Sequence, residues 1–248
     1  MTAPGSGSRG TAGQRLRAYA VHVYTASGVA LALLAALEMT APQPDVRFIF
    51  LLLFGTVFID ATDGPLARRW EVKRWAAQID GRVIDDLVDY LTFTFLPLLL
   101  MARMQWLPDP APLWIVPALI ASLLGFANRA AKDESGGFFL GFPSYWNVVA
   151  FYAAFNQGST GVWINAAIVL ALAALTVAPV RFLYPNLAPP PWKLPLLIGA
   201  AVWVLTLLVL LFSYPNAPGW LMAVSLLYPA FYAVLSFWLD RGRRAVDV

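Results

Sequence analysis

The fold is decided by the run FIFLLLFGTVFIDATDGPL, residues Phe48 to Leu66, and the run IDDLVDYLTFTFLPLLLMARM, residues Ile84 to Met104. Each run is mostly apolar and has about the length of α-helix that crosses a bilayer core of about 30 Å. Both runs nevertheless carry aspartates. Charges inside a membrane are costly and usually face a cavity, a partner or a metal. We therefore expect two neighbouring membrane-spanning helices whose acidic side chains have a function.

The rest of the chain continues the apolar pattern. Of its 248 residues, 60% are hydrophobic and 12% are charged, whereas about a quarter of the residues in a soluble domain are charged. Further spans are expected at residues Tyr19 to Leu37, Leu113 to Ala131, Ser144 to Phe155, Val162 to Phe182, Leu194 to Tyr214 and Trp220 to Leu239. The sequence therefore predicts an all-α integral membrane protein, a bundle of about eight transmembrane helices.

Basic residues predict the orientation, because cytoplasmic loops carry an excess of Lys and Arg. With a cytoplasmic N-terminus and an even number of spans, only Arg47 and Arg103 of the 17 Lys and Arg residues lie outside. We therefore expect both termini in the cytoplasm. A disordered cytoplasmic tail is expected over residues 1–16, a single transmembrane catalytic domain over residues 17–240 and a cytoplasmic tail over residues 241–248. A signal peptide is the alternative for the first span, but that apolar stretch is too long.

Charge and composition exclude several classes of function. The net charge of +3 fits attraction to the anionic headgroups of membrane lipids. Nucleic acid is not an expected partner, because the basic residues are dispersed over several helix ends. The chain has no cysteine, which excludes disulfides, thiolate metal sites and a cysteine nucleophile.

The aspartates recur at helical spacings. Asp60 and Asp63 are three positions apart and Asp85 and Asp89 are four apart, so each pair shares a helix face. The basic connection between the two helices folds their ends together, so the four carboxylates can converge on one cavity. Four acids that close repel one another unless cations intervene. Two divalent cations, Mg²⁺ or Mn²⁺, would neutralise them and leave coordination positions for phosphate oxygens.

The neighbouring residues suit a diphosphate ligand. Gly64 and Gly81 remove side chains where a bulky ligand approaches the helix backbone, and Ala67 keeps the same face small. Arg68 offers a planar fork for phosphate oxygens. The alternative is a structural network, in which the aspartates form salt bridges with nearby arginines at the membrane interface. Such a network would not require small residues at fixed offsets.

The motif Asp60-x-x-Asp63-Gly64-x-x-Ala67-Arg68, followed by Gly81-x-x-x-Asp85-x-x-x-Asp89, resembles the signature of the CDP-alcohol phosphatidyltransferase family. The connection between Arg68 and Gly81 is longer than is usual in that family. It is similar to the connection in the bacterial phosphatidylcholine synthase branch, as are residues 21–28 and 138–147. The resemblance implies the helical core of that family with two extra helices.

The resemblance also implies an activity, namely transfer of the phosphatidyl group of CDP-diacylglycerol to choline with release of CMP. The implied ligands of two divalent cations are Asp60, Asp63, Asp85 and Asp89. Asp89 would also act as general base on the choline hydroxyl. The cytidine diphosphate part would be held by Gly64, Ala67, Arg68 and Gly81. The implied location is the bacterial inner membrane, with the active site on the cytoplasmic side, and a homodimer is compatible with the resemblance.

Other residues are candidates for the substrate sites. The quaternary ammonium of choline is suited to an aromatic cage with a nearby acid. Candidate choline-binding residues are Tyr145, Trp146, Asn147 and Tyr24. An interfacial belt is the alternative for these aromatic rings. Thr25 is expected to line the nucleotide cavity, with hydrogen bonding between helices as the alternative. The single histidine, His22, is interpreted as a packing residue rather than a catalytic one.

Three alternative functions stay open, one of which is a non-catalytic lipid-binding scaffold. The acceptor could be another alcohol, such as serine, glycerol phosphate or inositol phosphate, although a phosphorylated acceptor would require an additional basic pocket. A divalent cation transporter would also use acids within the membrane. Transporters usually place ion sites near the bilayer midplane on broken helices, whereas these aspartates are expected at cytoplasmic helix ends.

Overall fold

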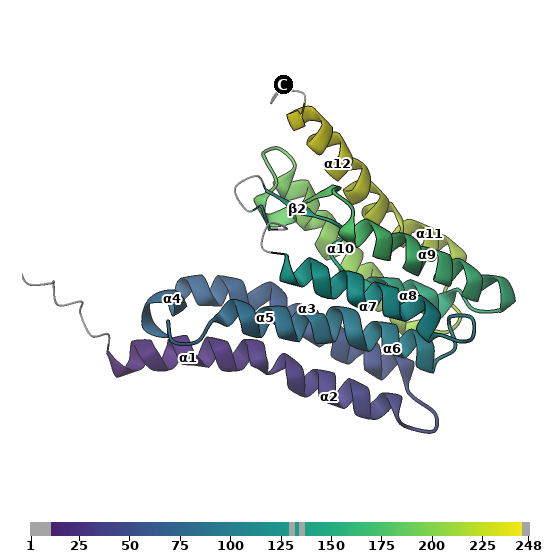
Figure 1. Ribbon diagram of the computed structural model, residues 1–248, viewed down its shortest axis with the longest axis horizontal. Coiled ribbons are helices and arrows are strands. Elements are labelled where there is room, and N and C mark those ends of the chain that lie inside the picture. Colours follow the sequence, from purple (N-terminus) through teal and green to yellow (C-terminus); the bar gives the residue numbers. More distant parts are fainter. Residues whose placement is uncertain (1–10, 129–131, 134–136, 245–248) are drawn as a thin grey trace, which may run out of the picture.

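Helices form most of the protein (Figure 1), whose computed structural model describes residues 11–128, 132–133 and 137–244. The helices in the first half of the chain are α1 (Ala12–Ala26), α2 (Gly28–Met39), α3 (Val46–Arg69), α4 (Val72–Trp75), α5 (Gly81–Asp89), the π-helical segment η1 (Tyr90–Phe95), α6 (Leu96–Arg103) and α7 (Pro112–Ala127). Those in the second half are α8 (Trp146–Phe155), α9 (Ser159–Val177), the 3-10 turn η3 (Pro185–Leu187), α10 (Lys193–Phe212), α11 (Gly219–Ser225) and α12 (Leu227–Arg244).

Each predicted span overlaps with one helix or with consecutive helices in the described part of the chain. The first span consists of α1 and α2, the third of α5, η1 and α6, and the last of α11 and α12. Stretches long and apolar enough to cross a membrane are Ala12–Met39, Ser159–Val177, Lys193–Phe212 and Gly219–Arg241. The chain is therefore a helical multi-pass membrane protein, while the prediction of eight spans stays a prediction.

The first helix begins earlier than the predicted domain boundary at residue 17. Thr11 caps α1, because its hydroxyl accepts a hydrogen bond from the Gln14 N–H and its own N–H donates to the Gln14 side chain. Residues 12–16 are therefore helical rather than disordered, whereas residues 1–10 lie outside the described residues. At the other end, α12 continues to Arg244, into the predicted C-terminal tail.

The prediction of an all-α fold is wrong in one respect. The strands β1 (Lys132–Asp133), β2 (Phe138–Leu140) and β3 (Arg181–Leu183) form an antiparallel sheet in the order β1-β2-β3. The two predicted spans that lead into this sheet therefore end early, with α7 ending at Ala127 and α9 at Val177. Aromatic residues favour strands when they pair across a sheet. Phe139 and Phe182 pair in this way, with stacked rings 5.9 Å apart.

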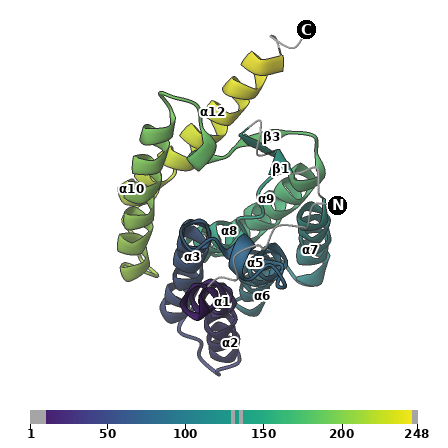
Figure 2. The same ribbon diagram turned by 90° about the vertical axis from the view of Figure 1, so that its left-hand side faces the viewer.

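The largest core cluster lies among α2, α3, α6, α7, α8, α9 and α10. Large apolar side chains also cover the outside of the molecule; Phe58, Leu113 and Trp220 are examples. This is the pattern expected for helices surrounded by lipid. Figure 2 shows α10 and α12 standing apart from α1 and α2, with α3 and α8 between them.

Gly141 allows the chain leaving β2 to approach the end of α9 closely. Its φ is +86°, and a Cβ atom there would lie 2.0 Å from the carbonyl oxygen of Thr176. We expect Gly141→Ala to lower the free energy of unfolding by about 1–3 kcal/mol, because the backbone must leave a conformation that L side chains rarely adopt. Thermal unfolding in detergent measures this loss. Gly219→Ala is the matched control, because a Cβ atom at Gly219 would meet nothing within 4 Å. Equal melting temperatures for the two variants would contradict the expectation.

Candidate active site

The acidic motif lies where α3 ends and α5 begins. Asp60 and Asp63 belong to the last turns of α3, and the short helix α4 belongs to the connection that leads back to α5. Asp80 caps α5, because its side chain accepts a hydrogen bond from the Arg82 N–H at 3.0 Å. This cap fixes the start of the helix that carries Asp85 and Asp89.

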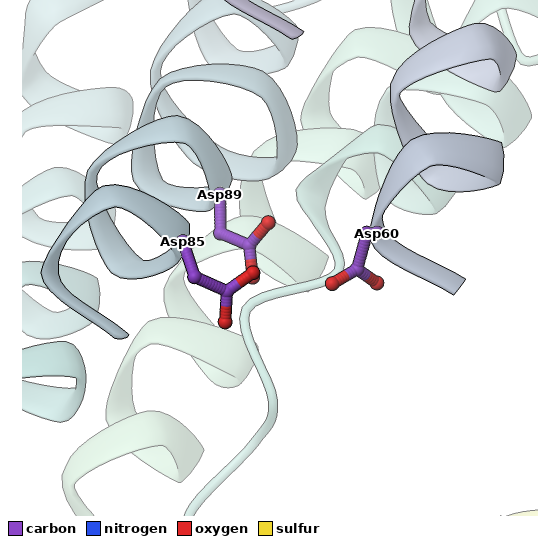
Figure 3. Close-up of side chains that lie close together, drawn as sticks. All are labelled: Asp60, Asp85 and Asp89. Atoms are coloured by element: carbon purple, nitrogen blue, oxygen red, sulfur yellow. The ribbon is translucent and has the colours of Figure 1, made fainter. Parts of the chain in front are cut away.

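Three carboxylates converge between these two helices (Figure 3). Asp85 and Asp89 project from successive turns of α5 towards Asp60 on α3. One oxygen from each carboxylate lies within 4.8 Å of the other two, and none of the three residues is buried. Carboxylates this close repel one another when all are ionised, and oxygen donors are the preferred ligands of hard divalent cations. The three side chains therefore fit a metal site.

Asp63 lies outside this group of three. It is buried, with 8% of its surface exposed, and its Oδ2 accepts a hydrogen bond of 2.8 Å from the hydroxyl of Thr25 on α1. Thr25, the predicted nucleotide-binding residue, therefore orients a carboxylate and joins two helices. The role of Asp63 as a fourth metal ligand stays a prediction.

Of the predicted diphosphate-binding residues, Gly64, Ala67 and Arg68 lie on α3, and Gly81 is the first residue of α5. The Arg68 side chain folds back along α3, so that its Nη1 lies 3.4 Å from where a Cβ atom on Gly64 would be. A Cβ atom on Gly81 would lie 2.9 Å from the His22 ring. Gly81 therefore lets the start of α5 approach α1, a structural role that the sequence did not reveal. His22 is buried, in agreement with a packing residue.

Two arginines bind acids outside the group of three. Arg74 forms an ion pair with Glu71 at 3.3 Å, and Arg82 forms one with Asp86 at 3.8 Å. The salt-bridge alternative predicted that arginines near the motif would pair with the clustered aspartates instead. Asp86 thus lies off the face shared by Asp85 and Asp89, as the helical spacing predicts.

Comparison with known proteins identifies the family. No protein-family model matches the chain. A phosphatidylcholine synthase of Pseudomonas aeruginosa is 41% identical over 172 residues, which cover 69% of this chain and 70% of that protein. The chain belongs to the phosphatidylcholine synthase family. The phosphatidylcholine synthases of Legionella pneumophila and Bradyrhizobium diazoefficiens are 32% and 38% identical to it, over 92% and 85% of this chain and 90% and 77% of theirs. The resemblance inferred from the acidic motif is thereby confirmed.

In this member of the phosphatidylcholine synthase family, the predicted choline residue Tyr145 directly precedes the first residue of α8, and 43% of its surface is exposed. The Tyr24 hydroxyl shares a 2.7 Å hydrogen bond with Thr62, between the two aspartates of α3. Asn147 lies in the first turn of α8.

Trp146 occupies a different environment from Tyr145. Its side chain is fully buried, and its indole Nε1 donates a hydrogen bond of 2.7 Å to the Ser122 hydroxyl. The Ser144 hydroxyl donates to the same oxygen at 3.0 Å. The ring thus holds the start of α8 against α7 and presents no free face to a ligand.

Sequence reasoning missed the π-helical segment that follows Asp89. Each π-helical turn contains an extra residue, and such segments often occur at functional sites. Within it, the Thr92 hydroxyl donates to the Val88 carbonyl at 2.9 Å and the Tyr90 hydroxyl donates to the Leu119 carbonyl at 3.2 Å. The segment joins α5, which carries the two acids, to α6, whose side chains belong to the largest core cluster. The alternating Thr and Phe residues lower helix propensity, but they do not specify a π-helical turn, so sequence reasoning had no specific signal for it.

Proposed function

We propose that this chain transfers the phosphatidyl group of CDP-diacylglycerol to choline and releases CMP at the site formed by Asp60, Asp85 and Asp89. The supporting observation is the convergence of these carboxylates, with oxygens within 4.8 Å of one another, in a member of the phosphatidylcholine synthase family. The products named for the relatives support choline as the acceptor. Family membership gives no support to the cation transporter, which is not proposed.

The group of three carboxylates is proposed to bind cations that neutralise the negative charge of the substrate. Asp60, Asp85 and Asp89, with Asp63 as fourth ligand, would hold two divalent cations, Mg²⁺ or Mn²⁺, which neutralise the charge of the diphosphate. The remaining contacts to the cytidine diphosphate are assigned to Gly64, Ala67, Arg68, Gly81 and Thr25. Arg68 suits this role because its guanidinium lies on the same end of α3 as Asp60, close to Gly64.

Asp89 is the proposed general base. The choline oxygen attacks the phosphorus that carries diacylglycerol, the bond from that phosphorus to CMP breaks, and the choline proton passes to the Asp89 carboxylate. Asp89 faces Asp60 across the gap between the two helices (Figure 3), so a hydroxyl group bound in this gap lies beside it. Asp60 and Asp85 are proposed to stay ionised while the proton moves, so the site keeps the negative charge that attracts cations.

Tyr145 is the proposed contact for the choline ammonium, with Tyr24 and Asn147 as neighbours. A quaternary ammonium donates no hydrogen bond, so an aromatic face and nearby negative charge are what can attract it. Tyr145 offers a partly exposed ring, and the three acids are proposed to supply the negative charge. Trp146 is left out of the proposed site because it is buried.

The proposed location is the bacterial cytoplasmic membrane, crossed by eight helical segments, with both termini and the active site on the cytoplasmic side. The basic residues support this orientation. Arg68, Arg69, Lys73, Arg74 and Arg82 surround the acidic end of α3 and α5, whereas Arg103 donates to the carbonyls of Met39 and Ala41 at the other end. A homodimer stays a prediction.

The acceptor is tested by supplying the purified protein with CDP-diacylglycerol, Mg²⁺ or Mn²⁺, and one labelled alcohol at a time. We expect labelled lipid and CMP from choline at a rate about tenfold or more above the rates with serine, glycerol phosphate and inositol phosphate. Extraction of the lipid product and measurement of CMP release provide two independent readouts. Incorporation of serine or glycerol phosphate without choline would overturn the acceptor assignment.

A further inference from the structure

A buried serine on α7 holds both neighbours of Tyr145. The Ser122 side chain is fully buried, and its oxygen accepts hydrogen bonds from the Trp146 indole at 2.7 Å and from the Ser144 hydroxyl at 3.0 Å. Both donors are buried as well, whereas Tyr145 between them is 43% exposed. One hydroxyl group therefore fixes the residues on either side of the ring that is proposed to contact choline.

Tyr145 is the central residue of a tight turn whose two ends bind Ser122. The Trp146 N–H donates a hydrogen bond of 2.8 Å to the Ser144 carbonyl, and Tyr145 has a φ of −76° and a ψ of 56°. These angles are those of an inverse γ-turn. Ser144 has a φ of +56°, a conformation that residues with a Cβ atom rarely adopt and that surrounding contacts must stabilise. The hydrogen bonds to Ser122 stabilise the turn from both ends.

The chain that enters this turn is also fixed. The Phe142 N–H donates to the Leu175 carbonyl of α9 at 3.1 Å. The Phe142 ring meets the Trp146 ring edge to face, with centroids 5.6 Å apart. Because the segments on both sides of the turn are anchored, Tyr145 has little freedom to shift while Ser122 keeps its two hydrogen bonds.

Helix α7 also contacts the segment that follows Asp89. Tyr90 is the next residue, and its hydroxyl donates to the carbonyl of Leu119 on α7 at 3.2 Å. Leu119 and Ser122 are three positions apart, so they lie on the same face of α7. The segment η1, which begins at Tyr90, packs against both α7 and α8, and Figure 2 shows α8 between α3 and α7. One face of α7 therefore sets the position of the turn relative to Asp89.

We propose that Ser122 is a positioning residue for the acceptor alcohol: it holds the Tyr145 ring where the ammonium of choline contacts it while the choline hydroxyl lies beside Asp89. This inference rests on the proposed function, which assigns the ring to the ammonium and Asp89 to the hydroxyl. In choline a short two-carbon linker joins the two groups, so the ring and the carboxylate must be held at one spacing. Ser122 acts through the turn and does not touch the substrate.

The test replaces Ser122 by alanine, which leaves the Trp146 indole and the Ser144 hydroxyl without their acceptor. We expect the KM for choline to rise about tenfold, while kcat and the KM for CDP-diacylglycerol stay within about twofold of wild type, because only binding of the ammonium is weakened. Tetramethylammonium carries the ammonium but no hydroxyl. Its inhibition constant against choline is expected to rise by the same factor as the KM.

Ser225→Ala is the matched control. Ser225 is also buried, 2% exposed, and its hydroxyl oxygen accepts a hydrogen bond of 3.1 Å from the Tyr152 hydroxyl. It lies on α11, and its partner lies in the second half of α8, away from the turn. Thermal unfolding should show a loss of stability in both variants, whereas only Ser122→Ala should raise the KM for choline. An equal rise in both would overturn the inference, because it would reflect a general loss of stability.

Trp146→Phe provides a second variant. It removes one of the two hydrogen bonds to Ser122 and keeps an aromatic ring against Phe142. We expect the KM for choline to rise by about threefold. If Ser122→Ala does not elute as a folded species in size-exclusion chromatography, this variant decides. A folded Trp146→Phe protein with the wild-type KM for choline would then overturn the inference.

Tyr145→Leu separates this inference from the proposed function, because it removes the ring itself. If the wild-type protein forms no phosphatidylcholine from choline, the proposed function fails. If Tyr145→Leu raises the KM for choline while folded Ser122→Ala keeps the wild-type value, the inference is overturned and the function stands. A higher KM in Ser122→Ala with unchanged inhibition by tetramethylammonium would also overturn it, since the ammonium contact would then be intact.

Discussion

Replacement of Asp89 by asparagine is expected to lower the turnover of CDP-diacylglycerol and choline by about 10²–10⁴-fold. Asparagine has nearly the same shape, but it cannot accept the choline proton and it removes one negative charge from the cluster. The loss should appear equally in CMP release and in labelled phosphatidylcholine. Because Asp89 is not buried, the variant should keep the melting temperature of the wild-type protein within a few degrees.

Asp86→Asn provides the matched control for this experiment. Asp86 lies on the same helix as Asp89 and pairs with Arg82 at 3.8 Å, a partly exposed interaction that contributes little free energy. Its activity is expected to stay within about twofold of wild type. A folded Asp89→Asn protein that turns over at the rate of Asp86→Asn would eliminate Asp89 as the base. A wild-type protein that binds lipid without any turnover would instead favour a non-catalytic lipid-binding protein.

Removal of divalent cations with a chelator is expected to reduce turnover to background, and addition of Mg²⁺ or Mn²⁺ should restore it. The carboxylates of Asp60, Asp85 and Asp89 and the diphosphate of the substrate are all negative, so they repel one another without a cation. Chelator already saturated with metal is the control for side effects of the chelator itself. Full turnover after exhaustive chelation would contradict the metal-site assignment.

Thermal unfolding gives a second readout of the metal that does not depend on activity. A cation that binds only the folded protein raises the melting temperature as its concentration increases. This rise should be present in the wild-type protein and smaller in Asp60→Asn. Asp63→Asn tests the fourth ligand: a reduced rise would support ligation, whereas an unchanged rise would leave Asp63 as the partner of Thr25 only.

Local patterns in the sequence predicted much of the helical part of the fold and the acids of the site. Apolar runs of spanning length located the helices, because membrane helices satisfy their backbone hydrogen bonds within one segment. The spacing of Asp85 and Asp89 placed them on one face of α5, as Figure 3 shows. The helix start at Ala12 was not predicted, although Thr11 and Gln14 form the capping box that marks it.

Contacts between distant segments could not be predicted in this way. The sheet depends on the pairing of Phe138 and Phe139 with Leu183 and Phe182, which are more than forty positions away. Burial of Trp146 depends on Ser122 of α7, although its neighbour Tyr145 is partly exposed. Neither interaction has a local signature, because aromatic residues at the start of a span suit a ligand cage, an interfacial belt or a core equally well.

The amino-acid sequence by itself determined that this protein is a helical membrane protein with an acidic motif on two successive helices, because hydropathy and helical periodicity are local properties. Only the tertiary structure decided which carboxylates meet. Asp60 joins Asp85 and Asp89, whereas Thr25 of α1 holds Asp63 aside. These outcomes depend on how separate helices pack, and the packing is set by many contacts between residues far apart in the chain.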